Sequence, residues 1–327
     1  MSDGVGAGSR ARRLARRTAG RGVRALLERS GRYRLAHLDR ERLVERWYHS
    51  PIPEWERLPA ETWTRRHPMP GVAWDPAPGL ELLEGPLRPL LAEFAPPEIP
   101  GTTAAERAAL LVFYDGLDGA TWHALLRHVR PRRVVELGSG VSTLIAAAAL
   151  ERNAADGAPA ELRVFDPYPR APTEAGIGHG RLERIPAERV PLEVFDELAA
   201  GDVLFVDTTH VVTTGGDVVR IFLEILPRLA PGVLVHVHDV LLPYDYHRMW
   251  FESGWYWNEQ YLVQALLQGN PEWEVVLPNH HLHRDHEDAV RAAVAAYDPA
   301  KQPSALWLRR RVAGERGSLA ERLRAPR

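Results

Sequence analysis

Short apolar runs alternate with segments of helical periodicity from about residue 104 onward. Runs of four to eight β-branched and aliphatic residues are typical of strands buried on both faces, whereas recurrence at i, i+4 and i+7 is typical of an amphipathic helix. The predicted strands are residues 133–137, 162–165, 181–185, 203–206, 233–237, 273–277 and 305–308. The predicted helices include residues 120–129, 142–150, 218–229 and 259–267. This alternation predicts an α/β fold, Rossmann-like and doubly wound, with a mostly parallel seven-stranded sheet.

The remaining chain differs in composition and predicts four regions. Residues 1–34 form an Arg-rich segment, interpreted as a flexible tail or as a basic helix that touches a membrane or nucleic acid. Residues 35–103, rich in Pro and Trp, predict an irregular N-terminal cap whose tryptophans pack on the main domain or line a substrate pocket. The main domain is predicted over 104–312, and a C-terminal tail over 313–327.

Charge and composition narrow the classes of partner. The formal net charge is -2 and the pI about 6.7, so the whole chain has no general attraction for nucleic acid. With no cysteine there are no disulfides and no thiolate chemistry. No apolar run reaches the roughly 20 residues of a transmembrane helix, and the start lacks the apolar stretch of a signal peptide. We therefore expect a cytoplasmic protein with a small-molecule partner, and leave a homo-oligomer open.

A glycine-rich loop joins the first predicted strand to the next helix, in the segment from Glu136 to Thr143 (Glu-Leu-Gly-Ser-Gly-Val-Ser-Thr). Glycines at such a junction let the backbone approach a ligand, and the helix start directs its N–H groups toward it. Asp166 follows the second strand, where an acid accepts hydrogen bonds from ribose hydroxyls or caps a turn. The loop and Asp166 predict a nucleoside-binding site. Thr143 stands where a dinucleotide fingerprint has a third small residue, which weakens an NAD(P) interpretation.

Acids and histidines follow the fourth and fifth predicted strands. Asp207 and His210 come after residues 203–206, and His238 and Asp239 come after residues 233–237. Because ligands bind at the carboxyl ends of parallel strands, these four side chains are expected on the same rim as the glycine-rich loop. Carboxylates suit a divalent cation, and imidazole suits proton transfer at neutral pH. His236, inside the strand, is interpreted as structural.

Three other polar segments have weaker interpretations. Asp115 and Asp118 precede a helix and are interpreted as caps or as part of a loop that closes over the ligand. Asn258 and Glu259 either face the acceptor or cap the helix that they begin. The His-rich residues 279–286 resemble a transition-metal site by composition, but without a spacing template a solvated loop is favoured.

Taken together, these motifs resemble a bacterial group of class I S-adenosylmethionine (SAM) dependent methyltransferases. The likeness covers the chain from about Tyr48 and rests on the glycine-rich loop, Asp-Pro-Tyr-Pro from Asp166, Val-Asp-Thr-Thr-His from Val206, His-Asp from His238, and the segment from Tyr256 to Tyr261. It implies that SAM is held by a set of loop and strand-end residues. These are Glu136, Gly138, Ser139, Gly140, Ser142 and Asp166.

The group is also similar to metal-dependent small-molecule O-methyltransferases. That similarity implies a Mg²⁺ site at Asp207 and Asp239, with His238 where such enzymes often have a second carboxylate. It further implies methylation of a hydroxyl on a sugar or natural product, with Asp207, Asp239 and His210 as catalytic residues and His210 as the general base. Two alternatives are kept: an NAD(P)-dependent Rossmann oxidoreductase and a non-catalytic SAM-binding scaffold.

Overall fold

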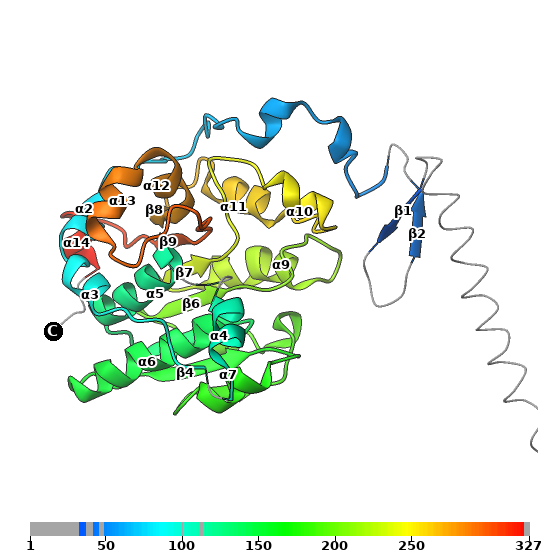
Figure 1. Ribbon diagram of the computed structural model, residues 1–327. Helices are drawn as coiled ribbons and strands as arrows, with labels where there is room; N and C mark the ends of the chain where they lie inside the picture. The colour runs from blue at the N-terminus through cyan, green and yellow to red at the C-terminus, as the bar shows by residue number, and fades with distance from the viewer. Residues whose placement is uncertain are drawn as a thin grey trace, which may run out of the picture. The chain divides into compact units, whose positions relative to one another are not determined.

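A computed structural model describes residues 33–36, 42–45, 49–99, 101–111, 114 and 116–323, and the chain divides into two compact units (Figure 1). The first unit comprises the described residues up to Trp63 together with His247–Tyr256. The second comprises Thr64–Tyr246 and the chain from Trp257 onward. The predicted Arg-rich tail lies outside the described residues, except for its last two positions.

The first unit contains short elements joined by aromatic contacts. The antiparallel strands β1 (Tyr33–Ala36) and β2 (Arg42–Glu45) form a hairpin, and three single-turn helices follow: η1 (Trp55–Arg57), η2 (Ala60–Trp63) and α10 (Arg248–Glu252). The Trp63 ring meets Phe251 edge-on with centroids 5.3 Å apart, and the Arg248 guanidinium lies 5.6 Å from the Trp55 ring centroid. These contacts join the residues around 250 to those around 60.

The second unit is built on a seven-stranded sheet with the order β5-β4-β3-β6-β7-β9-β8. All neighbouring strands are parallel except at β9, which is antiparallel to both β7 and β8. The strands are β3 (Arg133–Leu137), β4 (Glu161–Phe165), β5 (Arg181–Glu183), β6 (Val203–Val206), β7 (Leu234–Val237), β8 (Trp273–Pro278) and β9 (Leu306–Arg310). The predicted doubly wound, mostly parallel seven-stranded sheet is confirmed.

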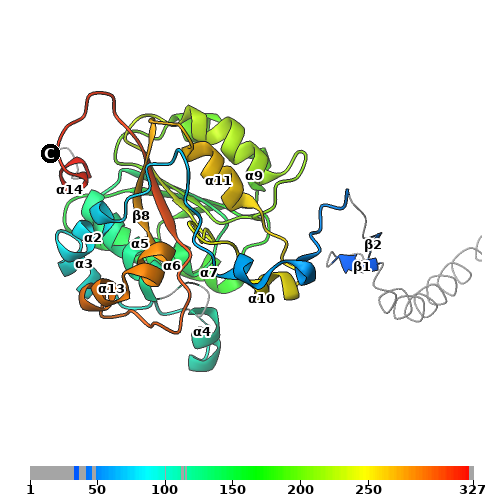
Figure 2. The same ribbon diagram turned by 90° about the horizontal axis from the view of Figure 1, so that it is seen from above.

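Helices cover both faces of this sheet, as Figure 2 shows with α5 and α6 on one side and α9 and α11 on the other. The side-chain alternation along β6 explains the two layers, because Val203 and Phe205 pack toward one face and Leu204 and Val206 toward the other. The first layer comprises α2 (Ala77–Glu84), α3 (Arg88–Ala92), α5 (Gly116–Val129), α6 (Val141–Ala155) and α13 (Glu287–Ala293). The second comprises α8 (Glu193–Asp196), α9 (Asp217–Arg220), the π-helical turn η4 (Ile221–Ile225), η5 (Leu226–Arg228) and α11 (Glu259–Leu267).

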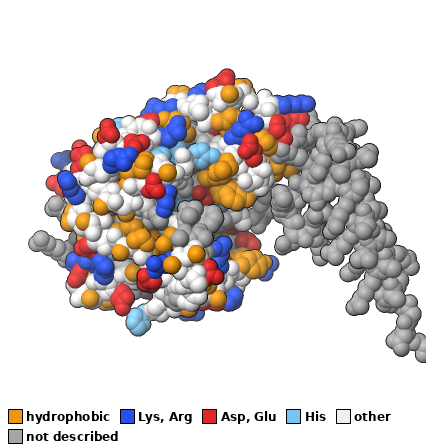
Figure 3. All heavy atoms as spheres, viewed as in Figure 1, with side chains coloured by type: hydrophobic (Ala, Val, Ile, Leu, Met, Phe, Trp, Pro, Cys, Tyr) orange, Lys and Arg blue, Asp and Glu red, His pale blue; other side chains and the backbone are white. Residues whose placement is uncertain are grey.

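Further short helices lie in the connections. They are α4 (Ala104–Leu111), α7 (Ala171–Gly176), η3 (Ala187–Arg189), α12 (Asn279–Asp285) and α14 (Leu319–Arg322). On the face seen in Figure 3, Lys and Arg side chains are interspersed with Asp and Glu, without a broad region of one sign.

Two segments that were predicted to lie outside the main domain contribute to its core. Residues 77–92, assigned to the irregular cap, form α2 and α3, and their leucines are buried against α5, β8 and the core between them. In the C-terminal segment, Leu319 and Leu323 are also buried in this cluster. The predicted domain boundaries at residues 103 and 312 follow changes in composition, whereas burial of these leucines depends on contacts with distant elements.

The core predicts a large difference between two leucine substitutions. Leu125→Ala removes a fully buried side chain on α5 and is expected to lower the free energy of unfolding by about 2–5 kcal/mol, from lost apolar burial and a cavity. Leu223→Ala, at a side chain 66% exposed, is expected to change it by less than about 0.5 kcal/mol. Urea denaturation of both variants tests this, and equal losses would contradict the assigned core.

Candidate functional site

The candidate site lies at the carboxyl ends of β3, β6 and β7. The chain passes from β3 to β4 on one side and reaches β6 on the other side, so the strand order reverses beside β3. In doubly wound sheets, ligands bind in the crevice outside the strand ends at such a reversal. The predicted loop and strand-end residues follow these three strands, except for Asp166, which follows the neighbouring strand β4, and the structure brings them all to one rim.

The glycine-rich loop lies directly against the end of β6. Gly138 has a positive φ of 88°, and a Cβ atom there would lie 1.8 Å from the carbonyl oxygen of Asp207. The Gly138 N–H donates to the carbonyl of Phe165 over 2.9 Å, and the Asp207 N–H donates to that of Leu137 over 2.9 Å. Only glycine satisfies both the φ value and the close approach.

Gly140 differs from Gly138 in both respects. It precedes α6 with an extended φ of -178°, and a Cβ atom built there meets nothing within 4 Å. Its N–H donates to the Thr143 hydroxyl over 3.0 Å. The fold therefore leaves space beside Gly140, at the start of α6, where a ligand can approach the backbone.

Glu136 and Asp166 both form hydrogen bonds with serines of this segment. Glu136 is fully buried and its Oε1 accepts a 2.6 Å hydrogen bond from the Ser142 hydroxyl. Burial raises the pKa of Glu136 to about 8, although the bond from Ser142 opposes this shift. Asp166 accepts from the Ser139 hydroxyl at 2.5 Å and from the Tyr168 N–H at 2.7 Å. The turn-capping interpretation of Asp166 therefore holds in this structure, and a ribose hydroxyl would compete with Ser139.

Asp207, His238 and Asp239 form a cluster of potential metal ligands. One donor atom from each lies within 4.8 Å of the others. His238 Nδ1 is 3.8 Å from Asp207 Oδ2 and 3.5 Å from Asp239 Oδ1, and it is buried without a hydrogen bond of normal length. Burial would lower the pKa of His238, but the two carboxylates raise it to about 9. Two carboxylate oxygens and one imidazole nitrogen within 4.8 Å of one another are a donor set that suits a divalent cation.

Two residues that were not predicted as metal ligands or catalytic residues, Ser304 and Asp118, contact this cluster. The Ser304 hydroxyl donates to Asp239 Oδ1 over 2.9 Å and lies 3.4 Å from His238 Nε2. Asp118 Oδ2 lies 3.8 Å from the same Nε2 and accepts from the Ser304 N–H at 2.7 Å. Asp118 was interpreted as a helix cap, and the structure instead buries it beside His238. Its partner Asp115 lies outside the described residues.

His210 is buried between three carboxylates. Its Nε2 is 3.1 Å from Asp207 Oδ1 and 3.5 Å from Asp239 Oδ2, while its Nδ1 is 2.9 Å from Glu259 Oε2. Burial would lower the pKa of His210, but the bonds with Asp207 and Glu259 and the charge of Asp239 raise it well above 6.5. His210 and Asp239 both have positive φ, 58° and 56°, which is uncommon for residues other than glycine.

His236 and Asn258 have structural environments. His236 is buried and stacked on Phe205 with centroids 4.3 Å apart, and burial lowers its pKa well below 6.5. This matches its interpretation as structural. Asn258 begins α11, yet its side chain accepts from the Val212 N–H at 2.6 Å and makes no capping bond to its own helix.

The His-rich residues 279–286 do not form a solvated loop. They form α12, and residues 279–283 are buried. His281 Nε2 contacts Asp285 at 2.9 Å, its Nδ1 accepts from the Trp74 indole at 2.9 Å, and burial lowers its pKa to about 4. The solvated-loop prediction was wrong because these polar side chains find partners inside the protein, including Tyr297 for His283.

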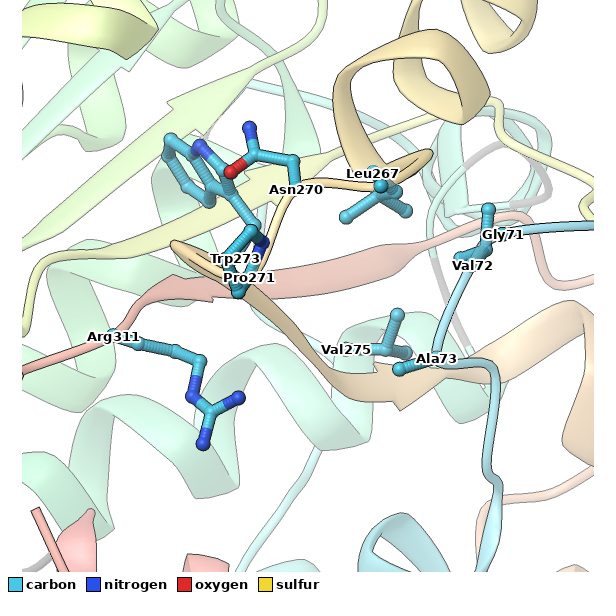
Figure 4. A pocket seen from close by; sticks show the side chains of 10 residues that line it. Gly71, Val72, Ala73, Leu267, Asn270, Pro271, Trp273, Val275 and Arg311 are labelled. Carbon is cyan, nitrogen blue, oxygen red and sulfur yellow. The ribbon is translucent and has the colours of Figure 1, made fainter.

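A cavity of about 380 Å³ lies elsewhere, between residues 71–73 and the edge strand β8 (Figure 4). It contains the Trp273 end of β8 and Arg311, which follows β9. Since β8 runs in the same direction as β7, this is the amino end of the sheet, opposite the rim. The cavity has no carboxylate and is not part of the candidate site.

Comparison with known proteins agrees with this geometry. Residues 135–240, which include the glycine-rich loop and the acidic strand ends, match the profile of a methyltransferase domain family, described as Methyltransf_24. No curated protein matches. This match assigns a methyltransferase domain to residues 135–240, within the doubly wound sheet.

Two solved structures show a distant likeness. One is recorded as cmcI-N160 SAH, with 14% identity over 59% of this chain and 75% of the other, at a TM-score of 0.32. The other is the plantazolicin methyltransferase BpumL in complex with a pentazolic desmethylPZN analog and SAH, with 11% identity over 71% of this chain and 97% of the other, at 0.37. Neither contributes to the assignment. Among the described residues, no helix is long and apolar enough to cross a bilayer.

Substitution of the two loop glycines is predicted to affect stability very differently. Gly138→Ala is expected to lower the free energy of unfolding by roughly 3 kcal/mol or more, because a Cβ atom meets the Asp207 carbonyl and φ is positive. Gly140→Ala, with open space and an extended φ, is expected to change it by less than about 0.5 kcal/mol. Denaturant titration distinguishes them, and a stable Gly138→Ala variant would contradict the close contact.

Proposed function

We propose that the rim of β3, β6 and β7 transfers a methyl group from SAM to a hydroxyl of a small molecule, such as a sugar or a natural product. The observation that carries this proposal is the placement of His210, Asp207 and Asp239 beside the glycine-rich loop of the methyltransferase domain. A donor site and a proton acceptor beside a potential cation site suit O-methylation.

The donor site is proposed to consist of Glu136, Gly138, Ser139, Gly140, Ser142 and Asp166. The open space at Gly140 gives the ligand access to the backbone at the start of α6. One oxygen of Asp166 accepts from the Tyr168 N–H of its own loop and the other from the Ser139 hydroxyl of the glycine-rich loop, and a ribose hydroxyl can replace that of Ser139. These contacts would hold the methionine and ribose parts of SAM.

The donor set of Asp207, Asp239 and His238 fits Mg²⁺ or Mn²⁺. Bound there, the cation would lower the pKa of a neighbouring acceptor hydroxyl. Ser304 and Asp118 would orient the ligands, since a ligating histidine usually contacts a second polar group through its other nitrogen.

In the proposed reaction, the acceptor oxygen attacks the methyl carbon of the sulfonium. A C–O bond forms while the C–S bond breaks, and its electron pair stays on sulfur, which gives S-adenosylhomocysteine. The hydroxyl proton goes to Nε2 of neutral His210, and the carboxylates of Asp207 and Glu259 stabilise the resulting imidazolium. Because these carboxylates raise the pKa of His210, the neutral form that accepts the proton becomes more populated as the pH rises.

The two alternatives lead to different results in solution. An NAD(P)-dependent oxidoreductase would bind the nicotinamide cofactor and not SAM. A non-catalytic scaffold would bind SAM without turnover. The matched methyltransferase domain and the histidine buried among carboxylates favour the catalytic proposal over both.

The donor site predicts a specific loss of affinity. Asp166→Ala is expected to raise the Kd for SAM by about tenfold, because one charge-assisted ribose contact is worth roughly 1.5–3 kcal/mol. Asp196→Ala, which removes an exposed carboxylate paired with Arg228, serves as the control with unchanged Kd. Isothermal titration calorimetry measures both, and unchanged SAM affinity in Asp166→Ala would refute the ribose role.

The cation site predicts a loss of activity. Asp239→Asn, or a chelator added to the wild type, is expected to reduce transfer of labelled methyl from SAM into a metabolite extract by roughly 100-fold or more. Asp245→Asn is the control, since that carboxylate pairs with His67 and Tyr261 outside the cluster. Mn²⁺ binding, followed by paramagnetic resonance, should be lost in Asp239→Asn.

The outcomes separate the parts of the proposal. Label incorporation that a chelator leaves intact would remove the cation and retain the methyltransferase. No incorporation, combined with no SAM binding, would overturn the methyltransferase proposal itself.

A further inference from the structure

Glu259 is a buried acid that contacts His210. It has 0% exposure in the first turn of α11, and its Oε2 lies 2.9 Å from His210 Nδ1. Burial raises its pKa, and the contact with His210 opposes that shift. Because a buried carboxylate is destabilising unless it is paired, the arrangement depends on His210.

From this geometry we infer that Glu259 is a positioning residue for His210. The Glu259 carboxylate accepts a hydrogen bond from Nδ1–H of His210, and this fixes the ring so that Nε2 faces Asp207 and Asp239. The imidazole has only two nitrogens, so a carboxylate that occupies Nδ1 decides which one is presented to the rim. This inference rests on the proposed function of His210.

Backbone contacts hold the same two segments together. The His210 carbonyl accepts from the N–H groups of Asn258 and Glu259, over 3.0 and 3.2 Å. The Asn258 side chain accepts from Val212 N–H, and the Trp257 ring lies 4.5 Å from that of His210, centroid to centroid. The start of α11 is therefore bonded to residues 210–212, and these backbone contacts hold Glu259 next to His210.

The residue before His210 has its own contacts, which do not involve Glu259. Asp217 accepts from the Thr209 N–H at 2.9 Å and from the Thr209 hydroxyl at 2.7 Å. The loop backbone keeps these contacts when the Glu259 carboxylate is removed. Loss of Glu259 should consequently free the imidazole ring more than the loop.

Glu259→Ala is expected to lower the maximal rate of methyl transfer by roughly 100-fold or more, the scale of losing an orienting acid behind a histidine. The Kd for SAM and the amount of acceptor that gives half-maximal rate should stay unchanged, because Glu259 is fully buried behind His210. Glu259→Gln keeps an acceptor for Nδ1–H and should retain more activity than Glu259→Ala. The acceptor is supplied as a dilution series of the extract fraction that the wild type labels.

A matched control lies one residue along the helix. Gln260 is also fully buried, and its side chain accepts from the Leu241 N–H at 3.0 Å. Gln260→Ala removes a buried polar group of the same turn without touching His210. Its rate per folded molecule should exceed that of Glu259→Ala, and denaturant titration of both variants measures their stability.

Proton NMR of the protein labelled with ¹⁵N-histidine gives a direct readout. The wild type should show a downfield, slowly exchanging Nδ1–H resonance that is absent in His210→Ala and lost in Glu259→Ala, but present in Gln260→Ala. A resonance that survives in Glu259→Ala, or an unchanged rate in that variant, would overturn the inference. If Glu259→Ala does not fold, the resonance and the rate are measured on Glu259→Gln instead. Because the glutamine still accepts from Nδ1–H, this variant should keep the resonance and part of the rate. Loss of both the resonance and the rate, or a wild-type rate without the resonance, would count against positioning.

Failure of the proposed function would look different. A wild type without methyl transfer would refute that function, while the NMR comparison would still show whether Glu259 holds the His210 ring.

Discussion

The contact between the Gly138 backbone and the Asp207 carbonyl sets the spacing across the rim, and the site depends on it. Parallel pairing of β3 with β6, and of β6 with β7, brings the ends of these strands together in register. There is no room for a side chain directly after β3, because a Cβ atom on Gly138 would overlap the Asp207 carbonyl at the end of β6. The loop and the acidic strand ends therefore approach as closely as two backbones allow, which places a donor site beside the carboxylates.

Burial of opposite charges gives the rim its chemical character. The side chains of His210 and His238 are buried, and both lie close to carboxylates. Those carboxylates raise the pKa of both rings. Burial of such groups costs free energy that only mutual pairing offsets. Two residues of the cluster, His210 and Asp239, also have a left-handed backbone. Costs of this kind are typical of functional sites, and this strain and charge burial support the proposal that the rim is one.

The sequence predicted the sheet and most rim residues because both depend on local signals. Strands buried on both faces are apolar along their whole length, and a polar residue that follows one lies at the rim whatever the packing. Glu259, Asp118 and Ser304 follow no such signal. They lie on α11, on α5 and before β9, and each reaches the cluster only because helices pack on the sheet at one particular position. The His-rich residues 279–286 were misinterpreted for the same reason, since their polar partners come from Trp74 and Tyr297.

By itself, the sequence determined the fold class, the glycine-rich loop and the set of acids and histidines at the strand ends. These follow from periodicity and from the backbone freedom of glycine, both of which act over a few residues. The tertiary structure alone decided which acid contacts which nitrogen of His210, and that leucines from residues 77–92 and 319–323 join the core. Those outcomes depend on distances between segments far apart in the chain, and burial and charge pairing set these distances only when the whole sheet is assembled.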